Sequence, residues 1–313
     1  MLRVIPFRRS AGLLAGYLLD GYLADRLDAQ PYTSLRRVRS AVSRRLRDRP
    51  RLRASCQATA AALAAGYLLS PRLRRHPLSQ FTVTTLATWA VLGSAGLNKE
   101  ARATADLLEH GRLATARANL VRLGIDNPYG LEEKALVRLA VEATARNTST
   151  VVTAPLLWGA LAGAPGLLGY RAVRALRVQV QRYPRRYGGL GPLVLRVAEA
   201  ADRIPDQATA VFFTVAAPLA GGDRAEGWRL FRQAGAGQAA EAATAGVLGL
   251  RLGGPDRVDP RAEPRPEIGY GRPPEPADVR RVARLSRVAG LLAVATPLAW
   301  SALAHLARGR ANR

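Results

Sequence analysis

A group of polar side chains stands at the start of a long uncharged stretch and could do chemistry. Its members are Glu142, Arg146, Asn147, Thr148, Ser149 and Thr150. Carboxylate, guanidinium, amide and hydroxyl groups together supply hydrogen-bond donors and acceptors of the kind that a polar site uses. Residues 147–170 carry no charge, and about 20 such residues suffice for a helix to cross a bilayer.

The uncharged stretch is interrupted by Gly163, Ala164, Pro165 and Gly166. Glycine and proline weaken or kink a helix. Broken helices at membrane depth are tolerated where they line protein or a cavity. The sequence therefore allows an ordinary kinked transmembrane helix, or a helical dip with a polar site at its entrance.

Other familiar catalytic signatures are missing from the 313 residues. The chain has one cysteine, Cys56, which excludes an internal disulfide and a multi-cysteine metal site. Its three histidines are far apart, at positions 76, 110 and 305. The glycine string at residues 235–240 follows no predicted strand, so it indicates a dinucleotide loop only weakly. No metal site is therefore predicted from histidine and cysteine.

The charge of the chain points to an anionic partner. Lys and Arg number 47 against 23 Asp and Glu, giving a net charge of +24, and nearly all the positive charge is arginine. Nucleic acid is not expected, because aromatic residues are only 6% and do not interleave with basic ones. Apolar blocks between the basic stretches favour membrane lipid and anionic substrates instead.

The apolar blocks predict the architecture. They lie at residues 10–24, 54–70, 79–97, 148–170, 206–220 and 285–306. Residues 26–53 form a basic stretch with apolar residues at helical spacing, which predicts either a helix on anionic headgroups or a solvated helix. Residues 98–146 predict soluble helices broken near residues 124–128, and residues 253–277, rich in Pro and Gly, predict a surface loop. Asp20 and Asp25 are either solvated helix ends or members of a polar site.

We therefore expect an all-α, polytopic integral membrane protein with a helical cytoplasmic portion and a broken central helix. Residues 1–313 are expected to form a single membrane domain, with a multi-pass location in the cell (inner) membrane. The residues alone do not predict the orientation or the reaction.

An ordered set of short sequence motifs gives more information about the function than the composition does. They are Leu18-Leu19-Asp20, Gly124-Ile125-Asp126-Asn127, Glu142 with Ala145-Arg146-Asn147-Thr148, Ala154-Pro155-Leu156-Leu157-Trp158, Gly163-Ala164-Pro165-Gly166, Tyr170-Arg171-Ala172, Asp202-Arg203-Ile204-Pro205, and the run from Glu241 to Pro255. In this order they resemble the CobD/CbiB family, the adenosylcobinamide-phosphate synthases of cobalamin (vitamin B12) biosynthesis. The resemblance extends from about Ala15 to the last apolar segment.

The chain also departs from the family pattern. Arg146 stands where the family has a glutamate, and Thr150 where it has an aspartate. Arg174 and Arg177 replace an asparagine and an aspartate, and residues 235–240 shorten a longer family string. Because carboxylates commonly hold Mg²⁺ on phosphates, the loss of three leaves two alternatives. Either the site works through the remaining acidic residues, or this member of the family is altered or inactive. The remaining acidic residues are Asp20, Asp25, Asp126, Glu142 and Glu241.

The resemblance implies a membrane ligase that joins adenosylcobyric acid to aminopropanol or its phosphate through an amide bond, with ATP and Mg²⁺. It implies that Glu142 and Asp126 assist metal or amine binding and that Asn147 and Thr148 orient the carboxylate. Arg171, Arg203 and Glu241 would bind substrate or phosphate, and Asp20 and Asp25 would assist a metal. Other enzymes of the cobalamin pathway are possible partners. The alternative is a catalytically impaired family member that acts as a membrane partner or binds a corrinoid.

Overall fold

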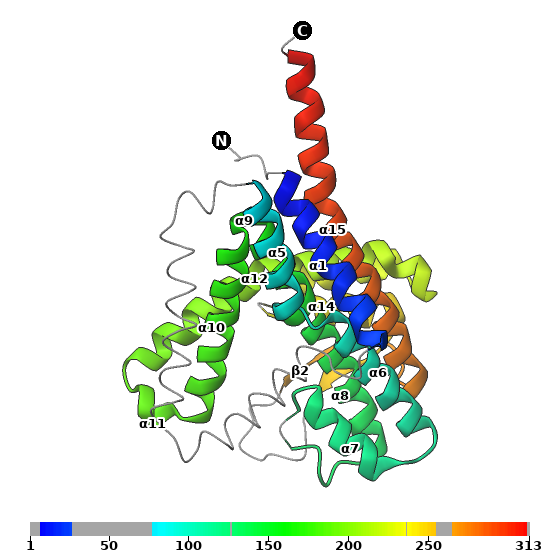
Figure 1. Cartoon of the computed structure of the whole chain (residues 1–313). Helices are drawn as coiled ribbons and strands as arrows, with labels where there is room; N and C mark the ends of the chain where they lie inside the picture. The colour runs from blue at the N-terminus through cyan, green and yellow to red at the C-terminus, as the bar shows by residue number, and fades with distance from the viewer. Residues whose placement is uncertain (1–6, 27–76, 126, 236, 255–264, 312–313) are drawn as a thin grey trace. The chain divides into compact units, whose positions relative to one another are not determined.

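The computed structural model describes residues 7–26, 77–125, 127–235, 237–254 and 265–311 (Figure 1). These residues are mostly helical and fall into two compact units. The first unit contains Met1–Gly96, Pro155–Ala172 and Val294–Arg313, and the second contains Leu97–Ala154 and Val173–Ala293. The predicted segment at 54–70 and the basic stretch at 27–53 lie outside the described residues.

The first unit is built around the pair α1 (Phe7–Arg26) and α5 (Pro77–Val91). Glycines let the two helices approach closely, because a Cβ on Gly16 would lie 2.5 Å from Thr88 Cβ and 2.7 Å from the Thr85 carbonyl oxygen. Gly12 meets Phe81 and Thr84 in the same way, one turn earlier. Helix pairs with small residues four apart pack this closely in membranes as well as in water. The rest of the unit comes from α9 (Ala154–Ala162), the start of α10 (Ala164–Arg182) and the end of α15 (Pro276–Ala311).

This packing gives a prediction for α1. Gly16→Ala should lower the thermal unfolding midpoint, because forcing a methyl into a filled interface costs about 1–3 kcal/mol. Gly21→Ala in the same helix is the matched control, since a Cβ there meets nothing within 4 Å. The control should be neutral or slightly stabilising, because alanine favours a helix over glycine. Equal midpoints for the two variants would contradict the close approach of α1 and α5.

The second unit is a helical layer around α8 (Glu133–Asn147), α12 (Leu190–Ala216) and α14 (Ala239–Leu248). Every residue of α14 is buried, and its small side chains explain how closely α13 (Arg224–Gln233) packs on it. A Cβ on Gly246 would lie 2.5 Å from the Glu226 carbonyl oxygen. The remaining helices are α6 (Ser94–Glu109), α7 (Leu113–Arg122), α11 (Pro184–Tyr187), the π-helix η1 (Thr148–Thr153) and the 3₁₀ helix η2 (Ala217–Ala220).

The helical prediction is confirmed for the described residues, and so are its main breaks. The central helix runs from α8 through η1 into α9 and ends at Gly163, which has a φ of 69°. Only glycine adopts such a φ readily. The predicted segment at 79–97 is not one helix, because α5 ends at Val91 and α6 starts at Ser94. A small antiparallel sheet, β1 (Leu252–Gly254) with β2 (Arg265–Ile268), also lies where the sequence predicted only a loop. These strands are too short for alternation to reveal them.

One described helix is long and apolar enough to cross a membrane. It is the part of α15 from Pro276 to Leu303, half of whose most apolar window is buried in the protein. A membrane location is therefore suggested, and the multi-pass arrangement stays a prediction.

Candidate functional site

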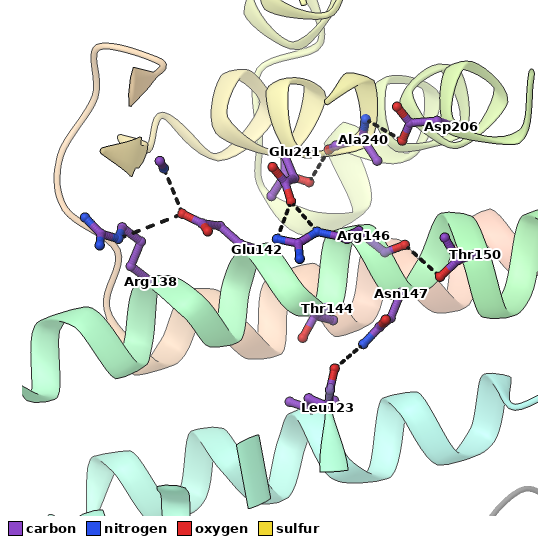
Figure 2. Close-up of polar contacts among 12 residues, drawn as sticks. Leu123, Arg138, Glu142, Thr144, Arg146, Asn147, Thr150, Asp206, Ala240 and Glu241 are labelled. Carbon is purple, nitrogen blue, oxygen red and sulfur yellow. Dashed lines mark hydrogen bonds and ion pairs between the residues drawn. The ribbon is translucent and has the colours of Figure 1, made fainter. Parts of the chain in front are cut away.

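A row of charged side chains follows one face of α8. Arg138, Glu142 and Arg146 are four residues apart, so they lie above one another on the helix. The face is directed at α14 and β1, which α8 contacts (Figure 2). The charges at the two ends of α8 suit the helix dipole, because Glu133 lies in its first turn and Arg146 in its last.

Glu142 connects α8 to the small sheet. Its side chain is only 2% exposed, and its Oε1 accepts a hydrogen bond of 2.7 Å from the backbone N–H of Gly253. Arg138 approaches the same oxygen at 3.9 Å (Figure 2). A buried carboxylate is stable only when it is paired and hydrogen-bonded. The Gly253 N–H and the Arg138 charge supply these conditions.

Glu241 is the second buried carboxylate, and Arg146 is its partner. Nε and Nη2 of Arg146 each lie 2.8 Å from Glu241 Oε1 (Figure 2). The Glu241 side chain is 5% exposed and that of Arg146 is 44% exposed. Arg146 therefore neutralises a carboxylate inside the unit while part of its guanidinium faces solvent.

Asp206 extends the polar group from α12. Its two carboxylate oxygens accept hydrogen bonds from the backbone N–H groups of Ala239, at 2.9 Å, and Ala240, at 3.3 Å. Asp206 thereby caps the start of α14. Burial raises the pKa of Asp206 above its ordinary value, and the negative charges of Glu241 and Asp202 add to this effect. Because Asp206 is affected by both neighbours, the carboxylates of α12 and α14 form one electrostatic group.

The raised pKa predicts how stability depends on pH. The folded state binds the Asp206 proton more tightly than the unfolded state does, so Asp206 stabilises most below the unfolded pKa of about 3.8. That contribution is lost as the pH rises through the folded pKa. The unfolding midpoint of Asp206→Asn should therefore improve relative to wild type between pH 4 and 7. A midpoint difference that does not change with pH would contradict the raised pKa.

Two arginines of α10 pair with one carboxylate of α12, that of Asp202. Arg174 and Arg177 from α10 donate to the same oxygen of Asp202 on α12, at 2.8 and 3.2 Å. All three side chains are partly exposed. Two guanidiniums against one carboxylate leave a net positive charge, and guanidinium groups are well suited to bind phosphate.

The structure brings together only some of the residues that the sequence singled out. Glu142 lies on the α8 row, and Glu241 of α14 meets that row through Arg146 (Figure 2). Arg203 is exposed on α12. Arg171 lies on α10 within the first unit, and the side chains of Asp25 and Asp126 lie outside the described residues.

Asn147, Thr148 and Asp20 have structural partners. Asn147 donates to the Leu123 carbonyl oxygen at 2.6 Å and so holds the end of α7, and Thr148 donates to Thr144 within α8. Asp20 is buried in the first unit, where it accepts from the hydroxyl of Ser94 and the N–H of Ala95 at the start of α6. These contacts explain why the three residues are polar. Whether they also touch a substrate stays a prediction.

The sequence did not reveal the partners of three arginines, Arg146, Arg174 and Arg177, or the cap made by Asp206. The four-residue spacing of Arg138, Glu142 and Arg146 was a usable signal, whereas the partner on α14 could not be read from spacing. The π-helix was missed as well. It places the buried hydroxyl of Thr153 without a hydrogen-bond partner in the described part of the chain, and π-helical turns are frequent at functional sites.

Within the described ranges, no three His, Cys, Asp or Glu side chains gather closely enough to hold a metal ion. Glu142 and Glu241 are instead engaged by Gly253 and Arg146. The described residues therefore do not form a metal site by themselves. Mg²⁺ commonly keeps its waters and binds through substrate phosphates with one or two carboxylates, and the row could supply those.

Comparison with known proteins gives the family. The family model described as CobD/Cbib protein matches residues 13–286. A cobalamin biosynthesis protein CobD of Mycobacterium tuberculosis is 34% identical over 302 residues, which cover 93% of this chain and 96% of the relative. Proteins of the same name from Geobacter metallireducens and Rhodobacter capsulatus are 36% and 32% identical over 62% and 67% of the chain, and 63% and 70% of their own lengths. No solved structure matches the chain. The chain belongs to the CobD/CbiB family.

Proposed function

We propose that the protein acts in cobalamin biosynthesis as a membrane adenosylcobinamide-phosphate synthase, which joins adenosylcobyric acid to aminopropanol or its phosphate. The family and the names of its relatives support a biosynthetic enzyme that handles corrinoids. The observation that carries the finer proposal is the α8 row together with Glu241 of α14, where two buried carboxylates are held beside one half-exposed guanidinium. These side chains place positive and negative charges close together, so they can bind a carboxylate substrate and an amine substrate side by side.

The acid and the amine need opposite partners. The part of Arg146 that faces solvent receives the carboxylate of the corrinoid, since a guanidinium pairs well with a carboxylate. Glu142 and Glu241 attract the ammonium group of the amine and, once it is positioned, accept the proton that its nitrogen loses. A low-dielectric, partly buried site strengthens both interactions. Holding the two reactants together supplies much of the rate.

Phosphate is the third group to be recognised. Arg174 and Arg177 are already held by Asp202 and keep a net positive charge, so they bind the phosphate of the amine donor or of a nucleotide. ATP with Mg²⁺, when bound, supplies the phosphoryl group that activates the carboxylate. The metal comes mainly with the phosphates in this proposal, because the described carboxylates do not form a site of three ligands. Arg203 lies in the same unit as Arg174 and Arg177 and is kept as a further phosphate ligand. The role of Arg171 stays a prediction.

A membrane assay tests the proposal. Membranes containing the protein are incubated with adenosylcobyric acid, aminopropanol phosphate, ATP and Mg²⁺, and the amide product is measured by mass spectrometry. We expect product from wild type. We expect at least a 100-fold loss in Glu241→Gln and Glu142→Gln, because each removes a charge from the reacting groups. Glu226→Gln is the matched control, since Glu226 is an exposed carboxylate on α13 paired with Arg229.

Two results would contradict the proposal. Full activity in both Glu142→Gln and Glu241→Gln would remove the α8 row from the reaction. Absence of product from wild type, with the Mycobacterium tuberculosis relative active in the same assay, would favour the catalytically impaired membrane partner. Asn147→Ala adds a distinction between roles: a substrate contact would change KM or kcat, whereas a purely structural contact would lower only the unfolding midpoint.

A further inference from the structure

A second basic feature lies away from the α8 row, between α6 and α15 of the second unit. A pocket of about 370 Å³ is lined by Arg102, Asp106, Arg280 and Arg284. Three guanidiniums therefore face one carboxylate across a concavity large enough for a small phosphate ester. The proposed reaction does not use any of these residues.

The pocket is fixed in shape by ion pairs. Arg280 on α15 binds two carboxylates of α6, those of Asp106 and Glu109. The hydrogen bond from Arg280 lowers the pKa of Glu109, so this carboxylate stays charged at neutral pH. A guanidinium held in this way loses little freedom when an anion binds, which favours binding. Counting Glu109, the pocket has three positive and two negative groups.

Arg284 gives the pocket its excess charge. Its side chain is exposed, and no described residue pairs with it. It follows Arg280 by four residues, so the two lie on the same face of α15. Arg102 stands four residues before Asp106 and so belongs to the face of α6 that carries the Arg280 partners. The lining is therefore arranged to receive an anion between the two helices.

The position of the pocket along α15 indicates which anion. Residues 288–307 of α15 carry no charge, whereas Arg280, Arg281, Arg284 and Arg287 precede them within about two turns. The one described helix that is long and apolar enough to cross a membrane therefore carries the basic pocket near its start and an uncharged stretch directly after it. Basic pockets at the edge of a transmembrane helix commonly bind the headgroups of anionic lipids.

We propose that the pocket of Arg102, Arg280 and Arg284 binds a phosphate-ester anion at the membrane edge of α15. The headgroup of an anionic phospholipid and a soluble phosphate ester share this chemistry. Arginine provides several donors in a planar fork that suits phosphate oxygens. Arginines at the start of a membrane helix commonly just extend into the headgroup region and bind no particular lipid. A pocket predicts instead a saturable site that binds one phosphate ester per chain.

The test measures lipid binding to the full chain. Wild type is purified in detergent, mixed with phosphatidylglycerol or phosphatidylcholine, and examined by native mass spectrometry. We expect one tightly bound phosphatidylglycerol and at least a tenfold weaker affinity for phosphatidylcholine. Arg102→Gln with Arg284→Gln should weaken phosphatidylglycerol binding about tenfold. Arg112→Gln with Arg196→Gln is the control, because it removes the same charge from exposed sites elsewhere in the second unit.

A competition arm separates the two sources of phosphate. If millimolar glycerol phosphate binds wild type but not the Arg102/Arg284 variant, and phosphatidylglycerol does not bind, the site takes a soluble ester. Equal phosphatidylglycerol binding in the variant and the control would overturn the proposal, as would the absence of both ligands from wild type. The binding measurement requires no enzymatic turnover. A negative result for anion binding can therefore be distinguished from a lack of the proposed synthase activity.

Discussion

Removal of the Arg146 side chain should be among the most damaging changes to this protein. Arg146→Ala leaves the Glu241 carboxylate buried without its cation. Losing the cation of such a pair costs about 2–3 kcal/mol, because the Glu241 carboxylate that remains is buried while the lost guanidinium was half exposed. We expect a lower unfolding midpoint and loss of amide synthesis. Arg146→Lys should recover part of the midpoint, because an ammonium keeps the charge but cannot place two donors on one oxygen.

A charge exchange isolates the pair itself. Arg146→Glu and Glu241→Arg should each be destabilising, since each places two like charges together at the junction of α8 and α14. Their combination restores an opposite pair, so the double variant should be more stable than the sum of the two single changes predicts. Additive effects would show that the two side chains do not interact. Arg229→Ala, which removes an exposed arginine from Glu226, is the control and should leave the unfolding midpoint nearly unchanged, because exposed ion pairs contribute little.

The helical class and the main breaks could be read from the sequence for physical reasons. Apolar blocks, the helical periodicity of residues 98–146, and the cluster at Gly163 to Gly166 act locally, so they are visible without a partner. The β1–β2 pair was invisible, because its register of Leu252 with Ile268 depends on a contact across a long gap in sequence. The contact between α1 and α5 also joins segments that are distant in sequence, so it was not predicted. The spacing of Gly12 and Gly16 was nevertheless a usable signal that α1 packs closely on another helix.

The candidate site was predicted in part. Glu142 and Glu241 were singled out, and the structure places both beside charged partners. Arg146 was singled out as a member of the polar group and as a departure from the family pattern, and its spacing from Glu142 placed the two side chains on one face of a helix. What could not be foreseen is that Arg146 would be satisfied by Glu241 from another helix. This pairing is decided by the packing of α8 on α14, and residue spacing within one sequence does not reveal such packing.

Gly253→Ala should disrupt the support of Glu142. Gly253 has a φ of 72°. That left-handed conformation costs an alanine roughly 1–2 kcal/mol. Its Cβ would also lie 2.1 Å from the Pro266 carbonyl oxygen, so strand β2 would have to move, and such overpacking costs about 1–3 kcal/mol more. The Gly253 N–H is the donor to Glu142, so displacement of β1 leaves a buried carboxylate less well satisfied. We therefore expect both a lower unfolding midpoint and a lower kcat.

Gly249→Ala separates the clash from the backbone strain. Gly249 ends α14 with a φ of 63°, but a Cβ there meets nothing within 4 Å. Both variants thus place alanine at positive φ, while only Gly253→Ala presses on β2 and displaces the donor to Glu142. The Gly249 variant should lose about 1 kcal/mol of stability and keep its kcat. Equal loss of activity in both variants would mean that the role of Glu142 in the reaction does not depend on the position of β1.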